Sequence, residues 1–141
     1  MKYFLSLIFC SLLLASCEIE ITGNGKLEGN WQLREIDTLA TNKTCNMSKS
    51  NIYWGIEGDI VQVRSIDKNQ KFLFHLEQKE NSMTISKPYY VQTKDYLTAV
   101  ESDTLLTSIG INGLQVSYHI SHKGNTLILT DHLLRLHFRK Y

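Results

Sequence analysis

The side chains that can hold a metal ion or activate a substrate include five histidines, and their spacing argues against a shared site. His119 and His122 are three positions apart, a spacing that places two side chains of one strand on opposite faces. His132 and His137 form neither a His-x-His pair nor a helical His-x-x-x-His pair. We therefore expect histidines at the surface or in turns, and no metal site.

Motifs of the common enzyme classes are also missing. The sequence has no Gly-x-Ser-x-Gly elbow, no His-Glu-x-x-His motif and no phosphate-binding glycine loop. The aspartates stand beside expected turns or loops, as solvated caps do; they are Asp37, Asp59, Asp67, Asp95, Asp103 and Asp131. We expect no catalytic residue, no enzymatic activity and no cofactor.

Residues 1–16 have the composition of a secretory signal peptide. Lys2 is followed by an apolar run from Tyr3 to Ala15 that only Ser6 and Ser11 interrupt. Such a run is too short to span a bilayer stably, and polar chain follows it. Loss of Lys2 reduces the 15 basic residues to 14, equal to the 14 acidic residues. This balance excludes the basic surplus expected of a nucleic-acid-binding protein.

The signal peptide ends at Leu14-Ala15-Ser16-Cys17, which resembles the lipobox of bacterial lipoproteins. The resemblance implies that Cys17 receives a diacylglyceryl group by thioether linkage and becomes the first residue after cleavage. The alternative is an ordinary secretory signal with a chance cysteine near its end. We expect the lipid, whose acyl chains contribute about 0.8 kcal/mol per buried methylene, to anchor the protein to a membrane.

The remaining cysteines give no disulfide scaffold. Cys10 leaves with the signal peptide and Cys17 is consumed by the lipid, so Cys45 is left as a single thiol, expected in a loop. Residues 17–25 are polar and contain glycine, so we expect a flexible tether. Glu18 and Glu20 resemble the acidic signals that send some lipoproteins to the outer face of the outer membrane. The two alternatives for the location of the protein are therefore the periplasmic face and the outer face of the outer membrane.

Alternation of apolar and polar residues is the dominant pattern of residues 26–141, which we expect to form a single domain. Turn-forming residues break the pattern at short intervals. The expected strands span residues 26–37, 52–56, 60–66, 71–78, 82–86, 114–121, 126–130 and 134–139. Residues 96–109 lose the clean alternation. We expect an irregular strand first and then a short helix or irregular segment around residues 102–109, capped by Ser102 or Asp103 and ended by Gly110. Pro88 is expected at a strand end or in a loop.

So many strands with short connections predict an all-β, antiparallel domain. The alternatives are an up-and-down eight-stranded barrel and a two-sheet sandwich. Consecutive short turns favour strands that pair with their neighbours in the chain, whereas a sandwich with Greek-key connections needs long crossovers. We therefore predict the barrel.

Gly29-Asn30-Trp31 opens the first expected strand, and the last strand ends in Arg139 and Lys140. This Gly-x-Trp, with a basic C-terminus, resembles the signature of the lipocalins and the wider calycin superfamily. Together with the lipobox, the layout resembles small lipocalin-like lipoproteins of the Gram-negative envelope. The resemblance implies that Gly29 and Trp31 help to close one end of the barrel, with a cation lying across the indole ring.

Strand parity selects the cation. Leu136 and Phe138 are expected to face inward, so Lys140 shares their face while Arg139 points outward. We expect Lys140 to lie over Trp31, with Arg139 as the alternative if a bulge shifts the strand.

The resemblance further implies a barrel that holds a small apolar or amphipathic ligand. Strand parity places Phe72, Phe74, Tyr118 and Leu136 on its lining, with no inward carboxylate or arginine in those segments. Lys87 and Lys140 are the basic residues of matching parity, so a ligand is expected to be neutral, or anionic only near the rim. The alternative is a non-catalytic interaction protein whose barrel is filled by side chains.

Substitution of the predicted lipid-attachment residue tests the anchor. The Cys17→Ala variant lacks the sulfur that forms the thioether, so it should no longer label with radioactive palmitate and should leave the membrane fraction. Cys45→Ser serves as the control and should label as the wild type does. Continued labelling and membrane retention of Cys17→Ala would contradict the lipoprotein assignment.

Overall fold

The structure, a computed structural model, describes residues 27–141. The expected signal peptide 1–16, the lipid-attachment residue Cys17 and the tether 17–25 lie outside the described residues. Within residues 27–141 no helix is long and apolar enough to cross a membrane.

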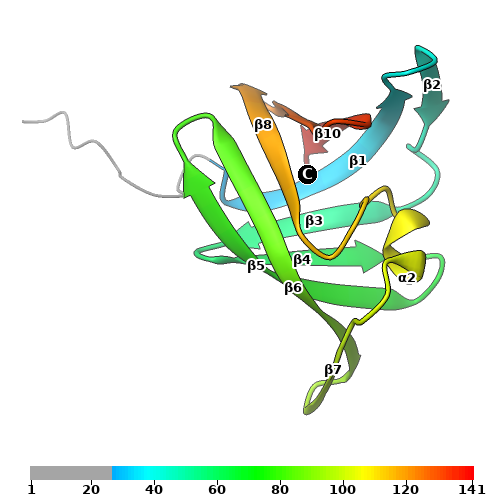
Figure 1. Ribbon diagram of the computed structural model, residues 1–141, viewed down its shortest axis with the longest axis vertical. Helices are drawn as coiled ribbons and strands as arrows, with labels where there is room; N and C mark the ends of the chain where they lie inside the picture. Colours follow the sequence, from blue (N-terminus) through cyan, green and yellow to red (C-terminus); the bar gives the residue numbers. More distant parts are fainter. Residues whose placement is uncertain (1–26) are drawn as a thin grey trace, which may run out of the picture.

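Antiparallel strands make up almost the whole described chain (Figure 1). One short helix, α2 (Thr104–Thr107), interrupts them. The strands are β1 (Gly29–Thr38), β2 (Lys43–Asn46), β3 (Ile52–Glu57), β4 (Ile60–Ser65), β5 (Gln70–Lys79), β6 (Ser82–Thr93), β7 (Tyr96–Ala99), β8 (Val116–Lys123), β9 (Thr126–Thr130) and β10 (Leu134–Lys140).

Eight of these strands close into an up-and-down barrel in the order β1-β3-β4-β5-β6-β8-β9-β10, and the pairing of β10 with β1 completes the ring. The predicted eight-stranded antiparallel barrel is therefore confirmed. Two short strands lie off this ring (Figure 1): β2 pairs with the end of β1, and β7 folds back on β6. The sequence analysis did not predict β2, because residues 43–46 lack an apolar alternation.

Alternating burial along each strand explains why these segments form a barrel. In β5 the side chains of Phe72, Phe74 and Leu76 are buried, whereas their neighbours are exposed or half-buried. In β10 Leu136 and Phe138 are buried in the same way. Each such side chain contributes about 1.5–3 kcal/mol when it is fully removed from water. The apolar faces of all eight strands meet in one core inside the ring.

A bulge in β1 reverses the parity of that strand. Leu33 pairs with Phe138 and Glu35 pairs with His137, so Arg34 is an extra residue on the β1 side. Ile36 consequently packs against the core, and Asp37 lies on the outer wall opposite Arg135. A bulge of this kind re-aims side chains that strict alternation would direct elsewhere.

A second bulge lies in β6. Leu73 pairs with Tyr89 and His75 with Ser86, which leaves one extra residue on the β6 side. Lys87 adopts a positive φ of 51° and is exposed, and Pro88 is buried. Two predictions are therefore wrong: Pro88 lies inside a strand, where the bulge tolerates its missing N–H, and Lys87 does not share the inward face.

The segment 100–115 covers the end of the barrel where β3 begins and β4 ends (Figure 1). Leu106, Ile109 and Ile111 are fully buried and belong to the barrel core. The predicted helix is present as α2, and Asp103 is its N-cap but makes no side-chain capping bond. We call residues 100–115 the lid.

Substitution of Gly110 tests how tightly the lid packs against the barrel. Its φ is +85°, and a Cβ added there would lie 2.9 Å from Ile36 Cδ1. Gly110→Ala should lower the free energy of unfolding by about 2–4 kcal/mol, since left-handed strain and overpacking add. Gly124→Ala, at φ +59° with nothing within 4 Å, should cost about 1–2 kcal/mol. Equal losses in urea denaturation would show that the lid is loosely packed.

Candidate functional site

Trp31 lies at the closed end of the barrel, where β1 begins and β10 ends. Its side chain is fully buried and its Nε1 donates a 2.8 Å hydrogen bond to the carbonyl of Leu27. Lys140 is its cross-strand partner, and Lys140 Nζ lies 5.4 Å from the centroid of the indole ring. This is the arrangement expected from strand parity, and Arg139 instead pairs with the outward-facing Gln32.

Gly29 makes room for the lysine. A Cβ at Gly29 would lie 3.2 Å from Lys140 Cε, and the residue has a φ of +125° that other residues rarely adopt. The lysine therefore crosses the glycine on its way to the indole, and its Nζ also donates to the carbonyl of Glu28 at 3.3 Å.

His122 completes the closed end, a role that the sequence analysis missed. Its ring meets Trp31 edge-on, with centroids 5.5 Å apart and planes at 88°. The signal was present in the sequence, because His122 has the same strand parity as the inward-facing Tyr118.

The four predicted lining residues, Phe72, Phe74, Tyr118 and Leu136, are all buried in one core. Trp54 lies among them, with its ring centroid 6.0 Å from Tyr118 and 5.0 Å from that of Phe138. Both contacts are edge-to-face, an arrangement that aromatic rings prefer. Large side chains thus occupy much of the space that the sequence analysis assigned to a ligand.

Two polar atoms inside this core have no hydrogen-bond partner in the described structure: Trp54 Nε1 and Tyr118 OH. Burial, followed by the negative charge of Asp131, raises the pKa of the Tyr118 phenol far above its ordinary value. Tyr118 is therefore a neutral hydrogen-bond donor at any physiological pH. Buried polar groups without partners are rare in proteins and call for an explanation.

Asp131 lies beside the lid and is almost fully buried. Its Oδ1 accepts hydrogen bonds from the backbone N–H groups of Leu133 and Leu134 at 2.7 and 2.6 Å. Asn112 of the lid donates to its Oδ2 at 3.4 Å. The prediction of a solvated cap is wrong for Asp131, since its carboxylate caps the turn from within and brings a negative charge near the interior.

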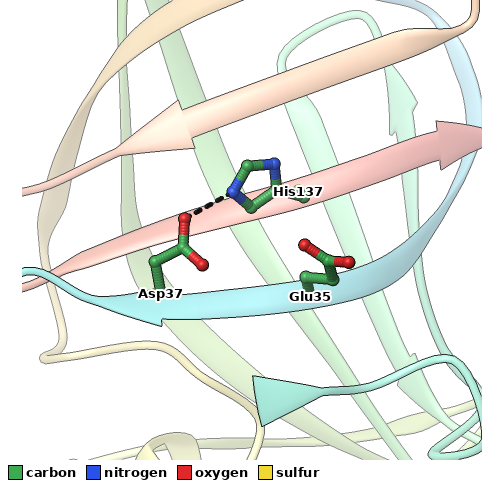
Figure 2. A group of neighbouring side chains, drawn as sticks. All are labelled: Glu35, Asp37 and His137. Carbon is green, nitrogen blue, oxygen red and sulfur yellow. Dashed lines mark hydrogen bonds and ion pairs between the residues drawn. The ribbon is translucent and has the colours of Figure 1, made fainter. Parts of the chain in front are cut away.

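A polar cluster lies on the outer wall, across the β1–β10 seam. Glu35 and Asp37 from β1 point toward His137 of β10 (Figure 2). His137 Nε2 donates a 2.7 Å hydrogen bond to Asp37 Oδ2, and Thr44 Oγ1 donates to Asp37 Oδ1 at 2.7 Å. These bonds, that of His137 first, hold the pKa of Asp37 below its ordinary value.

The family model of a lipocalin-like domain matches residues 12–141. The chain belongs to the lipocalin-like domain family. No curated protein matches the chain.

Two solved structures are similar to this lipocalin-like domain. One is a lipocalin-like protein from Bacteroides uniformis, with a TM-score of 0.63 and 16% identity over 83% of this chain and 100% of that chain. The other is an uncharacterized protein from Bacteroides eggerthii, with a TM-score of 0.56 and 15% identity over 81% of this chain and 98% of that chain. At these identities the likeness shows the fold alone.

A surface hollow of about 770 Å³ lies on the outer wall of the lipocalin-like barrel, around Asn30, Gly55 and Gln62. It is open to solvent, unlike the enclosed apolar cavity of a ligand site. It is also separate from Trp54 and Tyr118. The adjacent aromatics Tyr89 and Tyr90 lie on opposite faces of β6: Tyr89 is exposed, and Tyr90 packs against Phe72 with centroids 5.4 Å apart.

A double-mutant cycle measures the closed end. Trp31→Ala should cost about 3–5 kcal/mol of unfolding free energy, and Lys140→Ala about 1 kcal/mol. The double variant should lose less than the sum, because the lysine has no indole left to contact. Arg139→Ala is the matched control, since its side chain faces outward, and should be additive with Trp31→Ala. Additivity for Lys140 as well would show that the contact contributes nothing.

Proposed function

We propose that this lipocalin-like domain binds one small, largely apolar and uncharged molecule inside its barrel, and that it does so anchored to the bacterial outer membrane by a lipid on Cys17. The supporting observation is the pair of buried donors, Trp54 Nε1 and Tyr118 OH, that have no partner in the described structure. The protein is proposed as a binding module, without catalysis or cofactor.

The two donors favour a ligand with a hydrogen-bond acceptor. The rings of Trp54 and Tyr118 touch edge-to-face, so both donors belong to one part of the core. A buried donor without a partner costs about 1–3 kcal/mol, and a carbonyl or ether oxygen within hydrogen-bond distance of either donor would recover that cost. In a mostly apolar pocket, a few polar groups of the protein usually fix the orientation of the ligand, and here the two donors would do so.

The charges around the interior favour a neutral ligand. Lys87 points outward from the β6 bulge, and Lys140 is held across Trp31 at the closed end. The carboxylate of Asp131 is buried, and its negative charge contributes to the raised pKa of Tyr118. An anionic head group would be repelled by this carboxylate, and the core formed by residues 27–141 contains no cation to offset the repulsion. Esters, alcohols or sterol-like molecules therefore suit the site better than free fatty acids.

The lid gives the route of entry. Trp31 and His122 seal one end of the barrel, and the lid covers the other with Leu106, Ile109 and Ile111. A short segment with few backbone bonds to the sheet opens at lower cost than a strand of the ring. We therefore place entry at the lid, where outward movement of these three side chains opens the core that contains Tyr118.

The Tyr118→Phe variant tests whether the Tyr118 hydroxyl donates a hydrogen bond to a ligand or serves only the structure of the protein. It removes an unpartnered hydroxyl and keeps the ring, so the free energy of unfolding should stay unchanged or rise by about 1 kcal/mol. A neutral monoacylglycerol should raise the melting temperature of the wild type, and the shift should be much smaller in Tyr118→Phe. Palmitic acid should raise it less than the monoacylglycerol in the wild type.

Tyr53→Phe is the matched control, because Tyr53 lies on the outer wall against Tyr141. It should leave the ligand shift intact. Organic extraction of the purified protein followed by mass spectrometry adds a second measurement. No co-purified molecule and no shift with neutral lipids, sterols or fatty acids would favour the second candidate function, a filled-barrel lipoprotein that contacts another envelope protein. The packing of Trp54 against Phe138 is the observation that supports that candidate.

A further inference from the structure

We infer that Glu35, Asp37 and His137 form a binding site for a divalent transition-metal ion on the outer wall of the barrel, across the β1–β10 seam, with Zn²⁺ as the probe. This site is separate from the proposed ligand site in the interior, and either can fail without the other.

The three side chains present their ligand atoms to one another. One ligand atom from each, the imidazole nitrogen and a carboxylate oxygen from both acids, lies within 4.8 Å of the other two. Figure 2 shows the three side chains on neighbouring strands with their polar ends turned together. His137 Nε2 and Asp37 Oδ2 are 2.7 Å apart. In a tetrahedral zinc site the ligand atoms are about 3.3 Å apart, so small side-chain rotations suffice.

The bulge at Arg34 builds this set. With strict alternation after the inward-facing Leu33, Glu35 and Asp37 would also point inward. The extra residue turns both carboxylates outward, and Glu35 becomes the direct cross-strand partner of His137. Bulges recur where a strand must re-aim side chains at a functional site. The sequence analysis expected no metal site because no histidine pair has ligand spacing, and this set instead combines residues distant in the chain.

Hydrogen bonds from neighbouring residues orient the carboxylate of Asp37 for metal binding. Thr44 on β2 occupies Oδ1 with a 2.7 Å hydrogen bond, which fixes the carboxylate and leaves Oδ2 directed at His137. Bonds of this kind from outer partners orient metal ligands. The side chains of His137 and Asp37 are only 26% and 20% exposed, so they are partly shielded from solvent.

Arg135 opposes the site, since its NH1 lies 4.0 Å from Asp37 Oδ2. Its positive charge competes with a metal ion for the same oxygen. Its side chain is 46% exposed, however, so it can turn into solvent when the ion binds.

One imidazole and two carboxylates define the class of metal. Imidazole nitrogen suits zinc, copper, nickel and iron, whereas calcium and magnesium prefer oxygen ligands alone. Three protein ligands leave a coordination position for water, as in open zinc sites. On binding, the Nε2 proton passes to solvent and the imidazole carries a proton on Nδ1 instead, so that Nε2 offers its lone pair to the ion between the two strands. The ion then links β1 to β10, so it should stabilise closure of the barrel.

The experiment is titration of the purified, untagged protein with Zn²⁺ by calorimetry, together with thermal unfolding. A Cys45→Ser background removes the exposed thiol, which would otherwise bind zinc by itself. In this background the chain should bind one ion per chain at this site and melt at a higher temperature. Glu35→Gln, Asp37→Asn and His137→Gln should each weaken binding by about tenfold or more and reduce the thermal shift. Arg135→Gln should strengthen binding.

His75→Gln is the matched control, because His75 also lies on the outer wall and contacts a carboxylate, Glu77, at 3.6 Å, but belongs to no such set among residues 27–141. It should bind zinc as the background protein does. Glu35→Gln is the cleanest variant, since Glu35 is exposed and its loss should leave the fold intact. No binding in the background protein, or equal binding in Glu35→Gln and His75→Gln, would overturn the assignment.

Discussion

The pairing of β1 with β10 is the constraint on which the rest of this structure depends. It joins the first and last strands of the ring, so an open sheet with two exposed edges becomes a barrel without them. The same pairing sets Lys140 opposite Trp31 at one end and Ile36 opposite Leu136 at the other, beneath Gly110 of the lid. The closed end, the support of the lid and the outer polar cluster are therefore all built on one seam.

Regular strands were predictable from the sequence because burial on one side of a closed barrel imposes strict alternation. The eight ring strands and the inward faces of β5, β8 and β10 follow from that rule. The resemblance to lipocalins implied a cation over Trp31, and parity at a regular strand end selected Lys140 for it. The bulges in β1 and β6 could not be predicted from this rule, because an extra residue reverses the strand parity without a characteristic residue at the position where it occurs. The spacings of Ile36 after Leu33 and of Pro88 after Ile85 are their traces in the sequence, and such spacings also occur where a strand simply ends in a loop.

The rest of the candidate site depends on contacts between distant segments. The lid lacks alternation because Leu106, Ile109 and Ile111 reach the core from a helical turn and the loop after it. Trp54 and Tyr118 meet across the barrel, and whether their polar atoms find partners depends on every side chain around them. Asp131 looks like an ordinary turn residue in the sequence, and only the lid that covers it makes it a buried charge.

The interior combines tight packing with unmet hydrogen-bonding capacity, and these two properties have different physical consequences. Aromatic packing around Trp54 and Phe138 stabilises the closed barrel whether or not a ligand is present. The unpartnered donors of Trp54 and Tyr118 lower the stability of the folded barrel, and phenylalanine at both positions would avoid the cost. A purely apolar guest would gain contact area but leave both donors unmet. A guest with an acceptor would remove the cost as it binds, so the core would discriminate between the two by hydrogen bonding rather than by shape.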